Sequence, residues 1–410
     1  MTDHLLAWIY LRQVTEASSE DMLNLLWPDG WEHRTDPDAG VIDPRDVASR
    51  ILHRDASLPT RVLEATANRY QTNPRRELEI AHSKGYRLIT PSDDEWPRRL
   101  DQAFAHMVGS GADHDSAVRG LAAAPFALWV RGKGNVATLS EHTVTIVGTR
   151  ELDAYGVTVS QTIARDLALA GYGIVSGGAR GVDRVAHQAA LDAGNSTIAV
   201  LACGLEVDYP KQNQALFSQI AEQGVIVSEY PLETRPARHR FLTRNRLVAA
   251  LSRGTVVTQA GNRSGALNTL NWAEAMLKPT MAVPGSVTSA ANQGCLNRIR
   301  DQRASLVASA EHVRELVETP SEYAAHMAEN PEQPMLNFDG SAGADAMSLT
   351  QMTVFDATGI RSDNTGQLSR IQQDTGLPVQ LVMRTLKELQ TLGFVHRDGD
   401  RWIKVRHPQD

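Results

Sequence analysis

The segment Thr143-Val-Thr-Ile-Val-Gly-Thr-Arg150 decides the fold, because a short apolar run ends in a glycine and an arginine before a helix-length stretch begins. The same arrangement returns in Gly173-Ile-Val-Ser-Gly-Gly-Ala-Arg-Gly-Val-Asp183. Short apolar runs bounded by turn residues are typical of buried strands. Two successive strand–turn–helix units therefore predict a parallel sheet.

The alternation continues toward the C-terminus. Further buried strands are predicted at Thr197–Leu201, Val225–Ser228, Thr255–Thr258 and Thr280–Val283. The helices are predicted at Tyr155–Ala170, Val182–Ala193, Gln212–Gln223, Leu242–Leu251 and Leu267–Leu277. Gly171, Gly194 and Gly224 follow three of these helices, at a position that favours a positive φ. The predicted fold class is α/β, an extended Rossmann-like domain whose ligands bind beyond the carboxyl ends of the strands.

Three other regions flank this α/β domain, which is assigned to residues 101–318. Residues 1–100 are predicted to form a helical N-terminal domain with a short strand in Gly85–Pro91, and residues 105–124 read as a loop. Residues 319–346 are rich in Pro, Ala, Gly and acidic residues, which is typical of a linker. Residues 347–410 are predicted to fold as a winged helix. Its three helices are Leu349–Ala357, Gln367–Asp374 and Pro378–Leu392, and its hairpin turns at Asp398-Gly399.

Composition narrows the class of protein. The 410 residues carry a net charge of −7, so a nucleic-acid site would have to be a local basic patch. Two cysteines, Cys203 and Cys295, cannot build a disulfide framework, which suits a reducing compartment. The sequence has no apolar run long enough to span a membrane, and its first residues lack the features of a signal peptide. We expect a cytoplasmic protein without membrane contact, metal or cofactor.

Two glycine-containing turns are candidate phosphate sites. Gly148 allows a close approach to the backbone, and Arg150 offers a planar fork for phosphate oxygens. Residues 176–183 place three glycines before a helix, where backbone N–H groups can surround an anion. Their spacing matches neither the dinucleotide-binding fingerprint nor a Walker A loop. The alternatives are a tight turn with a solvated Arg150 and a loop in which Asp183 caps the helix.

Two later segments add basic and aromatic residues. Lys211 follows Tyr209 and Pro210 in a loop where it can meet a phosphate, although an exposed lysine in a Pro-stabilised loop explains it equally well. The densest basic stretch runs from Arg235 to Arg246 around Phe241. A charge run is usually a solvated face, but basic residues around an aromatic ring also suit a single nucleic-acid strand.

The ordered series of motifs resembles the DNA-processing protein A family (DprA, also called Smf). The motifs that carry the resemblance are Val147–Arg150, Ser176–Asp183, Gly204–Pro210, Ser228–Pro231, Phe241 with Arg244–Arg246, Ser264-Gly265 and Ala282–Gly285. The resemblance implies a protein that binds single-stranded DNA, dimerises through its Rossmann-like domain and helps load the RecA recombinase in natural transformation. It places the phosphate-contacting arginine on Arg150 and the loop lysine on Lys211.

The predicted single-stranded DNA site lies on the carboxyl edge of the sheet. It comprises Gly148, Thr149, Arg150, Ser176, Gly177, Gly178, Gly181, Lys211, Arg240, Phe241, Arg244, Asn245 and Arg246. Departures from the family pattern occur at Gln259, where the family often has Glu, at Leu270, and at Arg303-Ala304. They leave the Arg150 and Lys211 side of the edge untouched.

A second class of function stays open. Related Rossmann-like folds include hydrolases of nucleotides or phosphoribosyl compounds, and these need a carboxylate near the glycine-rich loop. Glu229 and Asp183 are the candidates, whereas the non-catalytic hypothesis needs neither. The C-terminal unit is also undecided, because the predicted helix Pro378–Leu392 carries Arg384 and Lys387 beside Glu388, and either duplex DNA or a protein is a possible partner.

Overall fold

The computed structural model describes residues 3–17, 19–34, 40–114, 121–319, 321–323, 347, 349–359 and 366–405. The chain divides into two compact units, Met1–Ala325 and His326–Asp410. Most of the predicted linker lies outside the described residues. The further division of the first unit at residue 100 stays a prediction.

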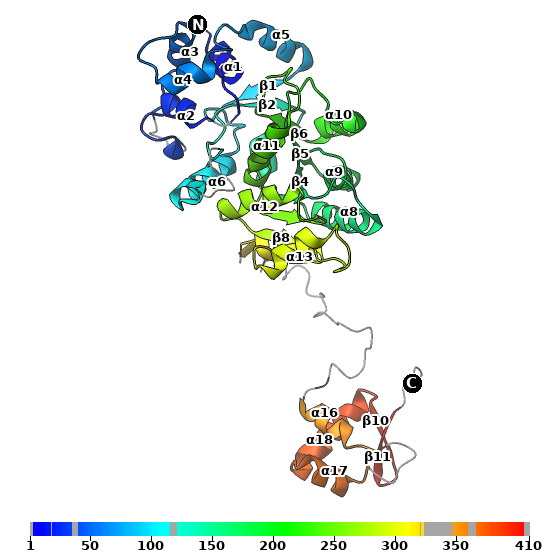
Figure 1. Ribbon diagram of the computed structural model, residues 1–410. Coiled ribbons are helices and arrows are strands. Elements are labelled where there is room, and N and C mark those ends of the chain that lie inside the picture. The colour runs from blue at the N-terminus through cyan, green and yellow to red at the C-terminus, as the bar shows by residue number, and fades with distance from the viewer. Residues whose placement is uncertain are drawn as a thin grey trace. The chain divides into compact units, whose positions relative to one another are not determined.

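A nine-stranded sheet forms the centre of the first unit (Figure 1). Its spatial order is β1-β2-β6-β5-β4-β3-β7-β8-β9. The strands are β1 Arg87–Ile89, β2 Leu128–Arg131, β3 Thr143–Val147, β4 Gly173–Ser176, β5 Thr197–Leu201, β6 Val225–Ser228, β7 Thr255–Val257, β8 Thr280–Ala282 and β9 Ser305–Leu306. Neighbouring strands pair in parallel along β6-β5-β4-β3-β7-β8-β9. In this sheet, the pairs β1–β2 and β2–β6 are antiparallel. The predicted α/β class with a mostly parallel sheet is confirmed.

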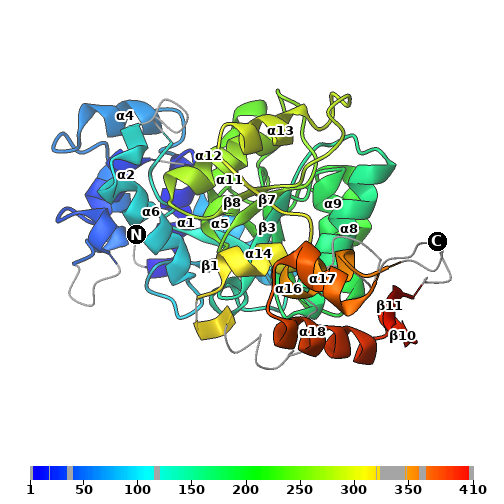
Figure 2. The ribbon, with the colours of Figure 1, turned by 90° about the horizontal axis from the view of Figure 1, so that it is seen from below.

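Helices cover both faces of the sheet because the strand side chains alternate between two apolar cores. Val144 and Ile146 of β3 join one core, while Val147 joins the other and Thr145 donates a hydrogen bond to the carbonyl of Val248, 2.8 Å away. The connecting helices of the domain are α7 Val136–Ser140, α8 Ala154–Leu169, α9 Val182–Asp192, α10 Gln214–Gln223, α11 Arg238–Ala250, α12 Ala266–Ala275, α13 Gln293–Arg300 and α14 Ala310–Val317. In both ribbon views α8 and α9 lie on the opposite side of the strands from α6 (Figures 1 and 2).

The N-terminal helices pack against the sheet domain rather than apart from it. They are α1 His4–Val14, α2 Glu20–Leu26, α3 Pro44–Leu52, α4 Thr60–Thr66, α5 Pro74–Lys84 and α6 Arg98–Gly109. One apolar core contains Leu11 of α1, Phe104 of α6, Val200 of β5 and Leu247 of α11. Burial in a shared core makes the first unit a single packed body.

Three sequence expectations about local structure were wrong. Residues 105–109 belong to α6 instead of a loop, because Leu100, Phe104 and Met107 form a buried helical stripe. Gly224 has φ −149° and not the expected positive value. A Cβ there would lie 2.2 Å from the carbonyl oxygen of Thr197, so this position takes glycine because no side chain fits. Helix α11 begins at Arg238, four residues before the predicted start.

The second unit contains three helices and a two-stranded sheet. Its elements are α16 Leu349–Asp356, α17 Leu368–Thr375, α18 Val379–Thr391, β10 Val395–Asp398 and β11 Arg401–Lys404. Val354, Ile371, Leu386 and Trp402 form its core, and Gly399 turns the hairpin with φ 64°. These elements match the predicted three helices and hairpin, and the choice between duplex DNA and a protein partner stays open.

Candidate nucleic-acid interface

The carboxyl ends of β3 to β6 bring the predicted loops to one edge of the sheet. The chain reverses its order of strand addition between β3 and β7, and ligands of open α/β sheets bind at such a switch point. The loop that follows β3 contains Gly148, Thr149 and Arg150. The backbone N–H of Thr149 donates to the carbonyl of Gln259, 2.8 Å away, which joins the two loops at the switch point.

Two basic side chains and two aromatic rings lie at this edge. The Cζ atom of Arg150 is 5.1 Å from the ring centroid of Phe241, and the rings of Phe241 and Tyr209 are 5.7 Å apart. Tyr209 is 42% exposed, and Arg150 and Lys211 are exposed as well. We call Arg150, Tyr209, Lys211 and Phe241 the edge cluster; it combines positive charge with one exposed and one partly buried aromatic ring.

The two glycine-containing turns pack directly on each other. The N–H of Val182 donates to the carbonyl of Thr149, 3.1 Å away. Gly181 has φ 82°, and a Cβ there would lie 2.2 Å from the same carbonyl oxygen. A Cβ on Gly148 would lie 2.4 Å from the Val182 side chain. Gly148 and Gly181 therefore allow the two turns to pack closely, and this packing fixes the backbone next to Arg150.

The glycine-rich loop is already occupied by the protein's own carboxylate. Asp183 accepts hydrogen bonds from the backbone N–H groups of Gly177, at 3.1 Å, and Ala179, at 3.2 Å. Burial raises the pKa of Asp183, while the charge of the nearby Arg244 opposes that shift. The open backbone nest expected from the sequence is thus not what the structure shows at these two N–H groups. Asp183 does not take its predicted capping role either, since it holds the preceding loop.

A residue that follows β5, Asn213, also holds the glycine-rich loop in place. The Nδ2 group of Asn213 donates to the carbonyls of Gly178, at 2.9 Å, and Ala179, at 3.0 Å. Lys211 stands two residues before Asn213 in the same short helical turn, Lys211–Asn213. The buried amide therefore ties the exposed lysine to the glycine-rich loop.

Arg244 fills the space that Gly177 leaves free. A Cβ on Gly177 would lie 2.1 Å from a guanidinium nitrogen of Arg244, which donates to the carbonyl of Val200. Arg244 is buried, and this burial lowers its pKa. The contact explains why the position takes glycine although its φ is not positive.

Arg246 belongs to a buried ion cluster. Its guanidinium donates to both carboxylate oxygens of Glu229, at 2.7 and 2.6 Å, and Arg12 of α1 lies 3.7 Å from the same carboxylate. All three side chains are at most 1% exposed. Phenyl rings of Phe104 and Phe126 lie against Arg246 and Arg12, at 5.3 and 4.4 Å from the centroids. This Arg12–Glu229–Arg246 cluster joins α1, α11 and the end of β6.

Arg240 and Asn245 also make contacts within the protein. Arg240 donates to Glu16, 2.8 Å away, and Glu16 also accepts from Arg69 at 2.7 Å. Asn245 donates to the side chain of Asn268, at 3.2 Å. Arg240 remains partly exposed, whereas Asn245 is buried.

The predicted site thus divides into exposed and buried residues. The edge and its turns hold Gly148, Thr149, Arg150, Gly181, Lys211, Arg240 and Phe241 at exposed or partly buried positions. The buried members are Ser176, Gly177, Gly178, Arg244, Asn245 and Arg246. Ser176 donates to the carbonyl of Ile146 at 2.6 Å. The assignment of the whole set to DNA stays a prediction.

Gln259 has a structural role at the switch point. Its Nε2 group donates to Asp153, at 2.9 Å, and to Asn292, at 3.0 Å, and the side chain is fully buried. A glutamate here would set a second carboxylate against Asp153, which the amide avoids. The sequence marked the departure but could not show these partners.

Residues 87–318, more than half of the chain, match the model of the family described as DNA recombination-mediator protein A. The chain belongs to that family. The resemblance to DprA and Smf proteins read from the motifs is confirmed.

Relatives of the recombination-mediator family cover almost the whole chain. A putative DNA processing protein DprA of Mycobacterium tuberculosis is 37% identical over 98% of this chain and 94% of its own length. Protein Smf of Escherichia coli is 31% identical over 97% of this chain and 95% of its own. The X-ray structure of DprA from Streptococcus pneumoniae matches with a TM-score of 0.60 and 26% identity, covering 78% of this chain and all of that one.

Within the described residues, no group of three or more His, Cys, Asp or Glu side chains is placed to hold a metal ion. Among the same residues, every helix is too short or too polar to span a bilayer.

Proposed function

We propose that the chain binds single-stranded DNA along the carboxyl edge of its sheet. The observation that carries this proposal is the edge cluster, in which Arg150, Phe241 and Tyr209 contact one another at the surface beside Lys211. Cationic groups attract the phosphate backbone, and exposed aromatic rings stack on bases whatever their sequence. The family description, a mediator of DNA recombination, agrees with this substrate.

The exposed and buried halves of the predicted site then have different roles. Residues of the edge cluster contact the single-stranded DNA. The glycine-rich loop and Arg244 hold the shape of the edge, since the N–H groups of Gly177 and Ala179 and a guanidinium nitrogen of Arg244 bond within the protein. Arg246 positions helix α11 through Glu229, so that the first turn of the helix presents Phe241.

The alternative function, hydrolysis of a nucleotide or phosphoribosyl compound, has less support from the structure. Glu229 is 1% exposed and neutralised by two arginines. Asp183 is buried and accepts two backbone hydrogen bonds. A catalytic carboxylate must be free to act on the substrate, whereas Glu229 is paired with two arginines and Asp183 holds the backbone of the glycine-rich loop. We therefore propose a binding protein and not an enzyme.

The cellular role is proposed from the family. A recombination mediator that holds single strands would protect incoming DNA and help load RecA, in natural transformation or another recombination process.

We propose a cytoplasmic homodimer. Two well-exposed apolar side chains, Val287 (75% exposed) and Leu306 (51%), lie after β8 and at the end of the edge strand β9, where a second copy could cover them.

Fluorescence anisotropy with a labelled oligo-dT tests the DNA proposal. We expect the double variant Arg150→Ala, Lys211→Ala to lose most of the binding of the wild type at low salt. Two fewer phosphate contacts should also reduce the slope of log affinity against log salt by about 1.4, at about 0.7 per contact. The matched control is Arg165→Ala, Lys133→Ala, which removes the same charges elsewhere. Equal binding by both double variants would move the site away from this edge.

A further inference from the structure

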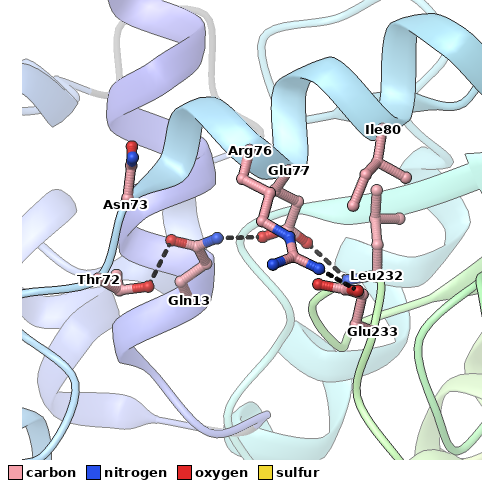
Figure 3. Close-up of a pocket in the computed structure, with 8 residues that line it drawn as sticks. All are labelled: Gln13, Thr72, Asn73, Arg76, Glu77, Ile80, Leu232 and Glu233. Atoms are coloured by element: carbon pink, nitrogen blue, oxygen red, sulfur yellow. Dashed lines mark hydrogen bonds and ion pairs between the residues drawn. The ribbon is translucent and has the colours of Figure 1, made fainter.

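A cavity of about 290 Å³ lies at the same edge of the sheet, between the N-terminal helices and the loop after β6 (Figure 3). Gln13 of α1, Arg76, Glu77 and Ile80 of α5, and Leu232 and Glu233 of the loop line it. This volume is at the lower end of ligand pockets, which begin near about 300 Å³. It suits a group of the size of one planar base.

The inner wall of the cavity is a fixed hydrogen-bonding network. Glu77 is 5% exposed and accepts from the amide of Gln13, at 2.5 Å, and from the N–H of Leu232, at 2.6 Å. Thr72 donates to the other end of the Gln13 amide, at 3.0 Å. An ionised carboxylate has about four acceptor positions, so the two that are used leave room for further N–H donors.

The chemistry of this wall selects a base over a phosphate. Carboxylates of Glu77 and Glu233 repel an anion, whereas a carboxylate accepts readily from the amino group of cytosine. Ile80 supplies an apolar surface for a ring. Burial raises the pKa of Glu77, and the hydrogen bonds from Leu232 and Gln13 oppose this shift and favour the ionised carboxylate.

The rim carries a charge pair that can exchange partners. Arg76 lies 2.8 Å from Glu233, and their side chains are 71% and 57% exposed. Exposed pairs of this kind contribute only about 0–1 kcal/mol. A DNA phosphate can therefore replace Glu233 as the partner of Arg76 at little cost.

Ion pairs connect the first turn of α11 to the segment that precedes α5. Arg240, in the same helical turn as Phe241, donates to Glu16, and Glu16 accepts from Arg69. Arg69 precedes Thr72, which lines the cavity. The exposed residues Arg235 and Arg238 lie near the start of α11, and Arg75 lies beside Arg76 on α5. Both α11 and α5 thus carry exposed basic side chains near the residues that these ion pairs join.

We infer that the single strand continues from the edge cluster onto α5 and places one unstacked base in this cavity, with Arg76 on an adjoining phosphate. The inference rests on the proposed function and extends it to the N-terminal helices. It gives these helices a direct part in holding DNA.

Abasic scanning tests the cavity. The probe is the shortest oligo-dC that binds the wild type with full affinity, long enough to span both sites but with a single register, and one abasic residue is moved along it. For the wild type we expect one position, beyond those that the edge cluster needs, at which base removal weakens binding about five-fold or more. In Ile80→Trp, which fills the cavity, removal at that position should have no further effect. An equal loss in wild type and variant would overturn the inference.

A matched pair of surface variants tests the rim without disturbing the fold. Arg76→Ala and Glu233→Ala both remove the same ion pair. We expect Arg76→Ala to weaken binding of the long oligonucleotide about three-fold or more, and Glu233→Ala to leave it unchanged or tighter. Equal effects of the two variants would mean that only the ion pair matters and would overturn the inference. A wild type that binds no oligonucleotide would instead overturn the proposed function.

Discussion

The two ends of helix α11 use the same residue types for opposite purposes. In its first turns Arg238 and His239 are exposed, and Phe241 contacts Arg150 at the surface. One and a half turns later Arg246 is fully buried against Glu229. The difference comes from the neighbours: Arg246 packs against Glu229 and Phe104 of α6, whereas Arg238 and His239 face solvent. Charge in a sequence therefore marks a binding surface only where the fold leaves it exposed.

The buried end gives the largest expected effect. Glu229→Gln leaves Arg12 and Arg246 without a counter-charge, and breaking a buried pair in this way typically costs about 3–5 kcal/mol. Urea unfolding followed by circular dichroism measures the loss of unfolding free energy. Glu233→Gln is the control, because its side chain is 57% exposed and should change stability by less than about 0.5 kcal/mol. Similar stability of the two variants would contradict the structural role of the buried cluster.

The exposed end should affect binding and not stability. Phe241→Ala removes the ring that contacts both Arg150 and Tyr209. We expect a loss of about 1–3 kcal/mol in binding free energy for a single strand, the usual value of one base stacked on an aromatic ring. Anisotropy titration measures it. Leu242→Ala, the neighbouring residue at 47% exposure, should bind as the wild type does; equal losses would make the ring dispensable.

The ion pairs of Glu16 with Arg240, in the first turn of α11, and with Arg69 give the smallest effect, and it depends on pH. Burial opposes the charge of Glu16, but hydrogen bonds from Arg240 and Arg69 lower its pKa from 4.5 to about 2. A lowered folded-state pKa stabilises the protein above pH 4.5, and this stabilisation disappears as the pH falls toward 2. Because Glu16 is 39% exposed, Glu16→Gln should cost only about 0.2–1 kcal/mol at pH 7.

Thermal unfolding of the wild type and of Glu16→Gln across this pH range measures how much the ion pairs of Glu16 stabilise the protein. The difference in Tm should be present at pH 7 and shrink below pH 4.5. A difference that stays constant from pH 7 to pH 3 would mean that the ion pairs of Glu16 contribute nothing.

Much of the fold was predictable because it depends on local patterns. The strand from Thr143 to Val147 is recognisable from its apolar run, and Gly171 and Gly194 end helices with positive φ as expected. Arg150 and Lys211 were placed at one edge because the carboxyl ends of parallel strands meet there. Such inferences need only the strand period and the direction of the chain.

The sequence by itself determined the α/β class, the order of the strand-end loops and the family. Only the tertiary structure decided which of the charged residues reach solvent. Glu229 is distant in sequence from Arg12, and Asp183 closes a loop that its spacing alone would leave open to an anion. The cavity beside Glu77 likewise forms from α1, α5 and the loop after β6, three segments that meet only on folding. Long-range pairing leaves no periodic trace in the chain, because burial and partner choice depend on packing between distant segments.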